Sequence, residues 1–483
     1  MKHERPRNTV DIGIDGMIVA ALVTAAFLLQ VWHLKTALLP ATDEGVYALI
    51  GRMMMRGYVP HSDFPMWHMP LLPLLTGIGL WLTNSLFAMR VVFLAANCLA
   101  VFPLYATIKK LTQNPLAAVT GVAFYLSFHE MMAHDFRMLA IRQFANVFFI
   151  LFVWAGVCAW EKPWREWVQL ICCVASAMIF LPAAANIAAA ALGLVYMAPA
   201  KLRKDVAVHY GIMLCCAAVC AAMYLLAVDG ALRQVVFEQL QRMPFPRWAR
   251  IARIMAKPDA LLMAFGSASL LIGSAVFPKL RPLGTASLAV VLMSVFLSTN
   301  YFDHYISLGG PSLALGVAMG VLLIQDCITL LPEILRQSLT ACACTLLVLW
   351  QWSVNVPMLI REWQTPNDRI YREMIATLAE QPEPVLLTQA LFAAEANRLP
   401  VLEFHEHLFR PPVAKGMTPD QIAQAETDAC TIVIDTSMKR AVNANTIASW
   451  QARYNQVFTN PMATILVTGN AGCDDQREPP PRR

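Results

Sequence analysis

Long apolar runs recur along this chain from about residue 14 to residue 358. Each approaches or exceeds the roughly 18 residues at which a membrane-spanning helix becomes plausible. Only 14% of the 483 residues are charged, against roughly 25% in an average soluble domain. The runs predict an all-α polytopic membrane domain, whose expected surroundings are the lipid bilayer.

The last part of the chain has a different composition. From Arg361 on, charged residues, Pro and Asn return, and no apolar run is long enough to span a membrane. Short apolar strands alternate there with helix-like stretches such as 418–428, which is typical of a small α/β domain. The predicted strands cover 384–388, 399–404, 430–436 and 463–468. We therefore expect a membrane domain over 1–358, a soluble α/β domain over 359–475 and a disordered tail over 476–483.

The placement of Lys and Arg orients the chain, because basic residues beside short loops mark the cytoplasmic side. Lys2, Arg5 and Arg7 put the amino terminus in the cytoplasm. About eleven crossings then leave the soluble domain on the periplasmic or extracellular side of the cell inner membrane. The predicted crossings are 14–36, 88–108, 115–131, 138–160, two within 167–199, 207–228, 260–277, 283–298, 306–325 and 338–358.

Two apolar stretches are not predicted to form a single membrane-spanning helix each. The stretch 69–83 is short and contains Pro70 and Pro73, so it is predicted to be an interfacial or re-entrant helix. The block 167–199 has basic residues at both flanks, which requires an even number of crossings. We therefore predict a hairpin that breaks near Pro182.

The charge and the cysteines limit the partners and the compartment. The net charge of +5 is modest, and no nucleic-acid partner is indicated. Ten of the twelve cysteines lie inside apolar segments, where Cys packs as a small hydrophobe. Cys430 and Cys473 lie in the soluble domain and could pair if that domain faces an oxidising compartment.

The first outer loop carries two adjacent carboxylates, Asp43 and Glu44, ahead of a helical stretch over 44–57. Such a pair can accept a proton from a substrate hydroxyl, or hold a divalent cation through hard oxygen ligands. Asp43 could also cap the helix that follows, because Asp is a favoured residue at helix starts. Capping and catalysis are compatible.

The third outer loop, 228–260, is basic on the side of the membrane where basic residues are disfavoured. Its six basic residues are Arg233, Arg242, Arg247, Arg250, Arg253 and Lys257. A lipid-linked phosphate or pyrophosphate would balance this charge, because Arg binds phosphate oxygens with a planar, bidentate fork. Anionic lipid headgroups are the alternative ligands.

Two further polar groups are expected at the same outer surface. The turn TNYFDHY places Tyr301, Asp303 and His304 between two predicted helices, where they could bind substrate or cap a helix. The turn near Arg137 carries His129, Glu130, His134 and Asp135, which could donate metal ligands but lack the HExxH spacing. A solvated polar turn is the other interpretation of that group.

Several motifs occur in an order that resembles a known class of enzymes. The sequence has DEGVYALIGRMMMRGYV, then MPLLPLLTGIGLWL, then Arg90, and later FEQLQRM and FDHYISLGGPSLALGVAMGV. This series is similar to the C-type fold glycosyltransferases, over most of residues 10–325. The resemblance is to the family that includes protein O-mannosyltransferases and lipid A aminoarabinose transferases (glycosyltransferase family 39).

The resemblance implies an inverting transfer of a sugar from a polyprenyl-phosphate donor on the outer face of the membrane. Asp43 would be the general base, with Glu44 its neighbour or a metal ligand. Donor or phosphate binding is expected for Arg52, Tyr58, Arg137, Arg142, Arg242, Arg247, Arg250, Tyr301, Asp303 and His304. No cofactor is definite, but a divalent cation would use Asp43, Glu44 or Asp135.

One departure from the family pattern keeps other functions open. Where relatives usually carry a second acid near the start of the fourth helix, this chain has Arg142 and Gln143, with Asp135 a few residues earlier. The acceptor hydroxyl, on a lipid, a glycan or a protein, is not specified. A flippase for lipid-linked sugars or a non-catalytic assembly subunit are the alternatives. The charges gather at the outer surface and not at mid-membrane, which favours an enzyme over a transporter.

Overall fold

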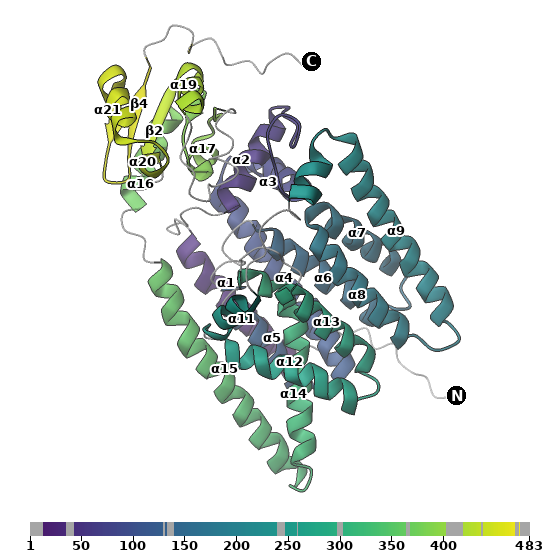
Figure 1. Ribbon diagram of the computed structural model, residues 1–483. Helices are drawn as coiled ribbons and strands as arrows, with labels where there is room; N and C mark the ends of the chain where they lie inside the picture. The colour runs from purple at the N-terminus through teal and green to yellow at the C-terminus, as the bar shows by residue number, and fades with distance from the viewer. Residues whose placement is uncertain are drawn as a thin grey trace.

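The computed structural model has a helical bundle with a small α/β domain at one end (Figure 1). The structure describes residues 13–34, 43–128, 131–132, 140–238, 247–257, 259–296, 303–363, 368–401, 419–435, 438–468 and 473. Figure 1 also shows α2 (Asp43–Met55) and α3 (Leu71–Thr83) between the α/β domain and the rest of the bundle. The first outer loop is therefore the junction between the two parts of the protein.

Apolar helices make up the bundle, as the sequence predicts. They are α1 (Ile14–Leu34), α4 (Leu86–Thr112), α5 (Pro115–Ser127), α6 (Ile141–Cys158), α7 (Trp164–Ile179), α8 (Leu181–Met197), α9 (Arg203–Ala227), α12 (Ala260–Val276), α13 (Arg281–Phe296), α14 (Gly310–Cys327) and α15 (Glu333–Trp363). Shorter elements join them: the π-helical turn η2 (Arg233–Phe237), α11 (Arg247–Met255) and the 3-10 helix η3 (Asp303–Gly309). Among the described residues, six helices are long and apolar enough to cross a membrane, and five more, α3, α5, α8, α12 and α13, are apolar but shorter. The exact number of crossings stays a prediction.

The block 167–199 forms two helices, and the predicted break near Pro182 is confirmed. Phe180 ends α7 and begins α8, and its backbone is extended, with φ −159° and ψ 114°. Pro182 lies in the first turn of α8, where its missing N–H costs no helical hydrogen bond. The break brings the side chain of Phe180 to the site described below.

The predicted interfacial helix corresponds to α3, which packs against α2 and α4. Its 13 residues extend about 20 Å at 1.5 Å per residue, well short of the roughly 30 Å of a bilayer core. α2 and α3 approach closely at two glycines, because a Cβ on Gly51 would lie 2.6 Å from the backbone nitrogen of Gly77.

Replacing Gly51 by Ala should force α2 away from α3. We expect the free energy of unfolding to fall by about 1–3 kcal/mol, as for other overpacked sites, which thermal unfolding in detergent would detect. Gly211→Ala is the matched control, because Gly211 in α9 has open space around its Cα. The control should be neutral or stabilising by up to about 1 kcal/mol. Equal effects at both positions would contradict close α2–α3 packing.

The carboxyl-terminal part, predicted to be a soluble domain and called so below, contains helices and a small sheet. It contains α16 (Asp368–Ala379), β1 (Val385–Leu386), α17 (Ala390–Ala396), α19 (Pro419–Asp428), β2 (Thr431–Asp435), α20 (Met438–Ala441), α21 (Ala444–Arg453), β3 (Asn455–Thr459) and β4 (Ala463–Val467). The sheet has the order β1-β2-β4-β3, with β1 parallel to β2 and the other pairs antiparallel.

Two details of this part differ from the sequence-based prediction. A strand was predicted at 399–404, of which residues 399–401 are described. These residues form no strand, and they make one isolated bridge, between Pro400 and Val385. β3, which the sequence analysis missed, is an edge strand with mostly exposed side chains. α15 ends at Trp363, and the domain limit at 358 stays a prediction.

Cys430 and Cys473 form a disulfide, as the sequence analysis left open. The other ten cysteines are free. We expect a thiol reagent to label ten cysteines in the denatured, unreduced protein, and all twelve after reduction. Mass spectrometry of the labelled protein measures both numbers. Twelve labels before reduction would show that the bond does not form.

Candidate functional site

A buried ion pair connects the start of α2 to the start of α4. Arg90 donates from Nε to Oε1 of Glu44 at 2.9 Å and from Nη2 to Oε2 at 2.6 Å. The relative exposure is 0% for Glu44 and 5% for Arg90. A third donor of Arg90, Nη1, reaches the carbonyl of Leu34 at 3.3 Å, which is the last residue of α1. The Arg90 guanidinium therefore connects the start of α4 to the start of α2 and to the end of α1.

The local sequence sets Arg90 at this place. Asn84 ends α3 in a left-handed conformation with φ 46°, which allows a tight turn into α4. The next residue, Ser85, caps α4, because its hydroxyl accepts from the backbone N–H of Ala88 at 3.2 Å. Arg90 lies in the second turn of α4 and Glu44 in the first turn of α2. A two-pronged, charge-assisted bond of this kind fixes orientation as well as distance.

Asp43 is the first residue of α2 and directly precedes Glu44. The structure describes its backbone within the helix, while its side chain lies outside the described atoms. Because both oxygens of Glu44 are bonded to Arg90, the backbone next to Asp43 is held firmly. Glu44 is thus anchored through both of its carboxylate oxygens.

Arg142, in the first turn of α6, lies at one end of a series of ring contacts. Its guanidinium carbon is 5.7 Å from the ring centre of Tyr305 in η3, within the range of cation–π attraction. Tyr305 stacks on Phe180 at 5.7 Å, and Phe180 meets His68 at 5.6 Å. His68 in turn lies 6.1 Å from Tyr47 of α2. These contacts connect α2, the α7–α8 junction, η3 and the start of α6.

Two amide side chains follow Arg142 on α6. Asn146 donates to the carbonyl of Ser307 at 2.9 Å and so fixes η3 against α6. Gln143 is 1% exposed, and within the described part of the chain neither its Nε2 nor its Oε1 has a hydrogen-bond partner. Buried amides are normally satisfied, so Gln143 offers one donor group and one acceptor to a ligand or to water.

Arg52 and Tyr58 lie elsewhere on the first outer loop. Arg52 donates from Nη1 to Oδ1 of Asn397 at 2.9 Å and from Nη2 to Oδ1 of Asn84 at 3.2 Å, so it bridges α2, α3 and the soluble domain. Tyr58 is half-buried, and this burial raises the pKa of its hydroxyl. Their predicted part in donor binding stays a prediction.

The basic third loop is described in part. Its helix α11, which carries Arg247 and Arg250, packs against α12, α13 and η3. The backbones of Arg247 and Arg250, and of Asp303 and His304 in η3, are described without their side chains. The predicted residues that lie outside the described ranges are His129, Glu130, His134, Asp135, Arg137, Arg242 and Tyr301. η3 is nevertheless the place where α6, α11 and α13 meet.

The described residues hold no group of three His, Cys, Asp or Glu side chains that could bind a metal ion. Glu44, one of the predicted ligands, already uses both oxygens for Arg90. A cation at this site would therefore depend on Asp43 and on groups outside the described side chains. Metal binding stays a prediction.

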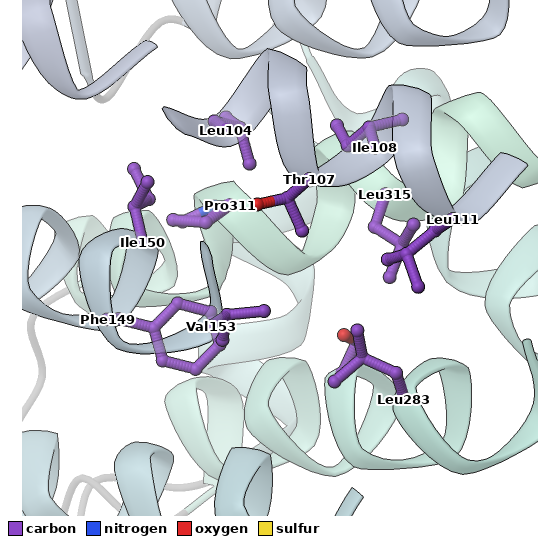
Figure 2. A pocket seen from close by; sticks show the side chains of 11 residues that line it. Leu104, Thr107, Ile108, Leu111, Phe149, Ile150, Val153, Leu283, Pro311 and Leu315 are labelled. Carbon is purple, nitrogen blue, oxygen red and sulfur yellow. The ribbon is translucent and has the colours of Figure 1, made fainter. Parts of the chain in front are cut away.

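An apolar cavity lies deeper in the bundle, between α4, α6, α13 and α14, and Figure 2 shows its lining side chains. Its cavity volume is about 30 Å³, roughly the space of one water molecule. The lining residues are Leu104, Thr107, Ile108, Leu111, Phe149, Ile150, Val153, Leu283, Ser287, Pro311 and Leu315. None of these residues is charged, and the Thr107 hydroxyl is bonded to the carbonyl of Pro103. With this volume and an uncharged lining, the cavity is a packing defect and not a candidate site.

No family model and no curated protein matches this sequence. The fold is that of the C-type glycosyltransferases, which confirms the resemblance drawn from the motifs. ArnT from Cupriavidus metallidurans bound to undecaprenyl phosphate is similar with a TM-score of 0.64 at 12% identity, over 93% of this chain and 97% of that chain. The apo state of that ArnT gives 0.60, with the same identity and coverage.

The oligosaccharyltransferase of Archaeoglobus fulgidus, in complex with Zn and sulfate, has a TM-score of 0.55. It is 12% identical, and the match covers 87% of this chain and 68% of that one. Identities this low demonstrate a common fold. The activity must be argued from the residues of this chain.

Proposed function

We propose that this protein is a membrane glycosyltransferase that moves a sugar from a polyprenyl-phosphate donor to an acceptor hydroxyl. The observation that carries this proposal is the Glu44–Arg90 pair, which anchors the start of α2 beside Asp43. The ring contacts that connect α2 to Arg142 support it. The shared fold with ArnT, which was solved with undecaprenyl phosphate, supports the class of donor.

The proposed reaction needs a base on one side of the sugar and a cation on the other. Asp43 takes the proton of the acceptor hydroxyl, and the acceptor oxygen attacks the anomeric carbon from the face opposite the phosphate. The bond between that carbon and the phosphate oxygen breaks, so the configuration inverts and the lipid phosphate leaves with an added negative charge. Arg142, together with Arg247 and Arg250 of α11, stabilises this charge.

The proposed location is the outer face of the cell inner membrane, with the amino terminus in the cytoplasm. The Cys430–Cys473 disulfide supports this orientation, because such bonds persist in oxidising compartments. α2, with Asp43, lies on the side of the bundle where the soluble domain docks. The acceptor, whether lipid, glycan or protein, would approach from that side.

Replacing Arg142 by Ala tests the donor site. If Arg142 binds the donor phosphate, affinity for undecaprenyl phosphate should fall about tenfold or more, since hydrogen bonds to charged groups contribute about 1.5–3 kcal/mol. Binding can be measured with purified protein in nanodiscs. The same preparation, offered a panel of radiolabelled polyprenyl-phosphate sugars, shows whether the wild type consumes a donor.

Arg165→Ala is the matched control for this experiment. Arg165 also lies over an aromatic ring, that of Trp160 at 4.5 Å, but it lies in the first turn of α7, which follows the opposite end of α6. The control should bind undecaprenyl phosphate as the wild type does. Equal losses in the two variants would contradict a specific role of Arg142, and a wild type that binds and consumes no donor would reject the proposed function.

A further inference from the structure

The soluble domain contacts α2 from the start of that helix to its end. At the start, a Cβ on Gly45 would lie 2.5 Å from the backbone nitrogen of Leu391, so the backbones of α2 and α17 touch. At the end, Arg56 donates to both oxygens of Glu383, at 2.9 and 3.1 Å. The contact surface therefore begins two residues from Asp43.

The ion pair at the end of α2 is itself held in place. Oε2 of Glu383 also accepts from the backbone N–H of Leu399 at 2.6 Å. Arg56 donates from Nη2 to the carbonyl of Asn397 at 3.0 Å, beside the bond from Arg52 to the Asn397 side chain. Arg56 and Glu383 are both largely buried, with side-chain exposures of 29% and 17%. A network of this kind favours one docking geometry over others.

Apolar side chains from the two parts form one common core. It contains Tyr47, Leu49, Ile50 and Met53 of α2, with Tyr371, Leu378, Val385, Leu391, Phe392 and Ile465 of the soluble domain. A domain that moved freely on a linker would have its own separate apolar core and would share no core residues with the bundle. This shared core ties the stability of α2 to that of the soluble domain.

Glu395 of α17 adds a carboxyl group next to the anchor of α2. Arg90, Glu44, Arg52 and Tyr371 are the groups that act on it. Burial raises the pKa of Glu395, and the positive charge of Arg90 opposes that shift. The soluble domain thus reaches the ion pair that fixes the start of α2.

We propose that the soluble domain is a positioning element for the transfer reaction, which holds α2, and with it Asp43, in place through Gly45, Arg52 and Arg56. This inference rests on the proposed function. A domain that served only to bind the acceptor would need neither the Gly45 contact nor the Arg56–Glu383 pair. Its loss would then change the acceptor KM and leave kcat intact.

Charge reversal tests the proposal. Glu383→Arg and Arg56→Glu should each lower kcat about tenfold, within the range of coupling energies for residues in one network. Affinity for undecaprenyl phosphate should stay within about twofold of the wild type, because the altered charges lie in the docking surface. The double variant with both reversals should regain kcat to within about threefold. Its recovery would show that the singles fail through the lost pair and not through misfolding.

Glu373→Arg is the matched control, since Glu373 forms an exposed pair with Arg369 on α16 of the same domain. It should leave kcat unchanged. Hydrogen exchange of the peptide 43–55 gives a readout that needs no donor: exchange should rise in both single variants and return to the wild-type rate in the double variant. If exchange and kcat do not change in the single variants, or the double variant does not recover, the positioning role is wrong. A wild type that binds and consumes no donor would instead reject the proposed function, while the exchange data still test the hold on α2.

Discussion

Asp43→Asn should lower kcat about 10²- to 10⁴-fold, which is the usual contribution of a general base. The amide is similar in size to the carboxylate, so the fold should remain intact. The Glu44–Arg90 pair would also remain, because it does not involve Asp43. Donor consumption measured at saturating donor, with a direct binding assay for undecaprenyl phosphate, separates the lost chemistry from lost binding.

Asp63→Asn is the control for this substitution. Asp63 lies in the same outer loop, is exposed, and accepts from the backbone N–H of Val59 at 2.6 Å. Its replacement should alter kcat by about threefold at most, as expected for a surface residue. If Asp43→Asn transfers sugar at the wild-type rate, Asp43 is not the general base of the reaction.

The helices of the bundle could be predicted because bilayer thickness and backbone hydrogen bonding limit what an apolar run can form. The break near Pro182 followed from the basic residues on both sides of one apolar block, and the structure has it at Phe180. The strands of the soluble domain were predictable where they are buried, as in β2. β3 was missed because an exposed edge strand has no apolar alternation to reveal it.

The contacts that make up the candidate site could not be predicted in the same way. Glu44 and Arg90 are 46 residues apart, and Arg56 and Glu383 are 327 residues apart. No sequence periodicity relates positions this far apart. The sequence therefore indicates which charged residues are of interest, but not which of them contact each other. The motifs singled out Arg90 but did not name its partner. Likewise, nothing in the sequence indicated that the guanidinium of Arg52 is bonded to Asn397 and Asn84, and its part in donor binding stays a prediction.

Glu44→Gln should strongly destabilise the protein, because it removes the carboxylate that is bonded to both Nε and Nη2 of the buried Arg90. Breaking one half of a buried ion pair costs about 3–5 kcal/mol. We therefore expect a large drop in the midpoint of thermal unfolding in detergent. Glu373→Gln, which breaks an exposed pair, is the control and should cost less than about 1 kcal/mol.

A double variant distinguishes the stabilising role of the pair from its positioning role. With Glu44 and Arg90 both replaced by Met, neither charge of the bonded pair remains buried, and apolar replacements of such pairs are often neutral or stabilising. Thermal stability should therefore return to near the wild-type value. The bonds from Arg90 to Glu44 and to the Leu34 carbonyl would still be missing, so the start of α2 would lose its fixed orientation. Donor consumption should stay low in this stable variant, and full activity there would mean that the pair does not position Asp43.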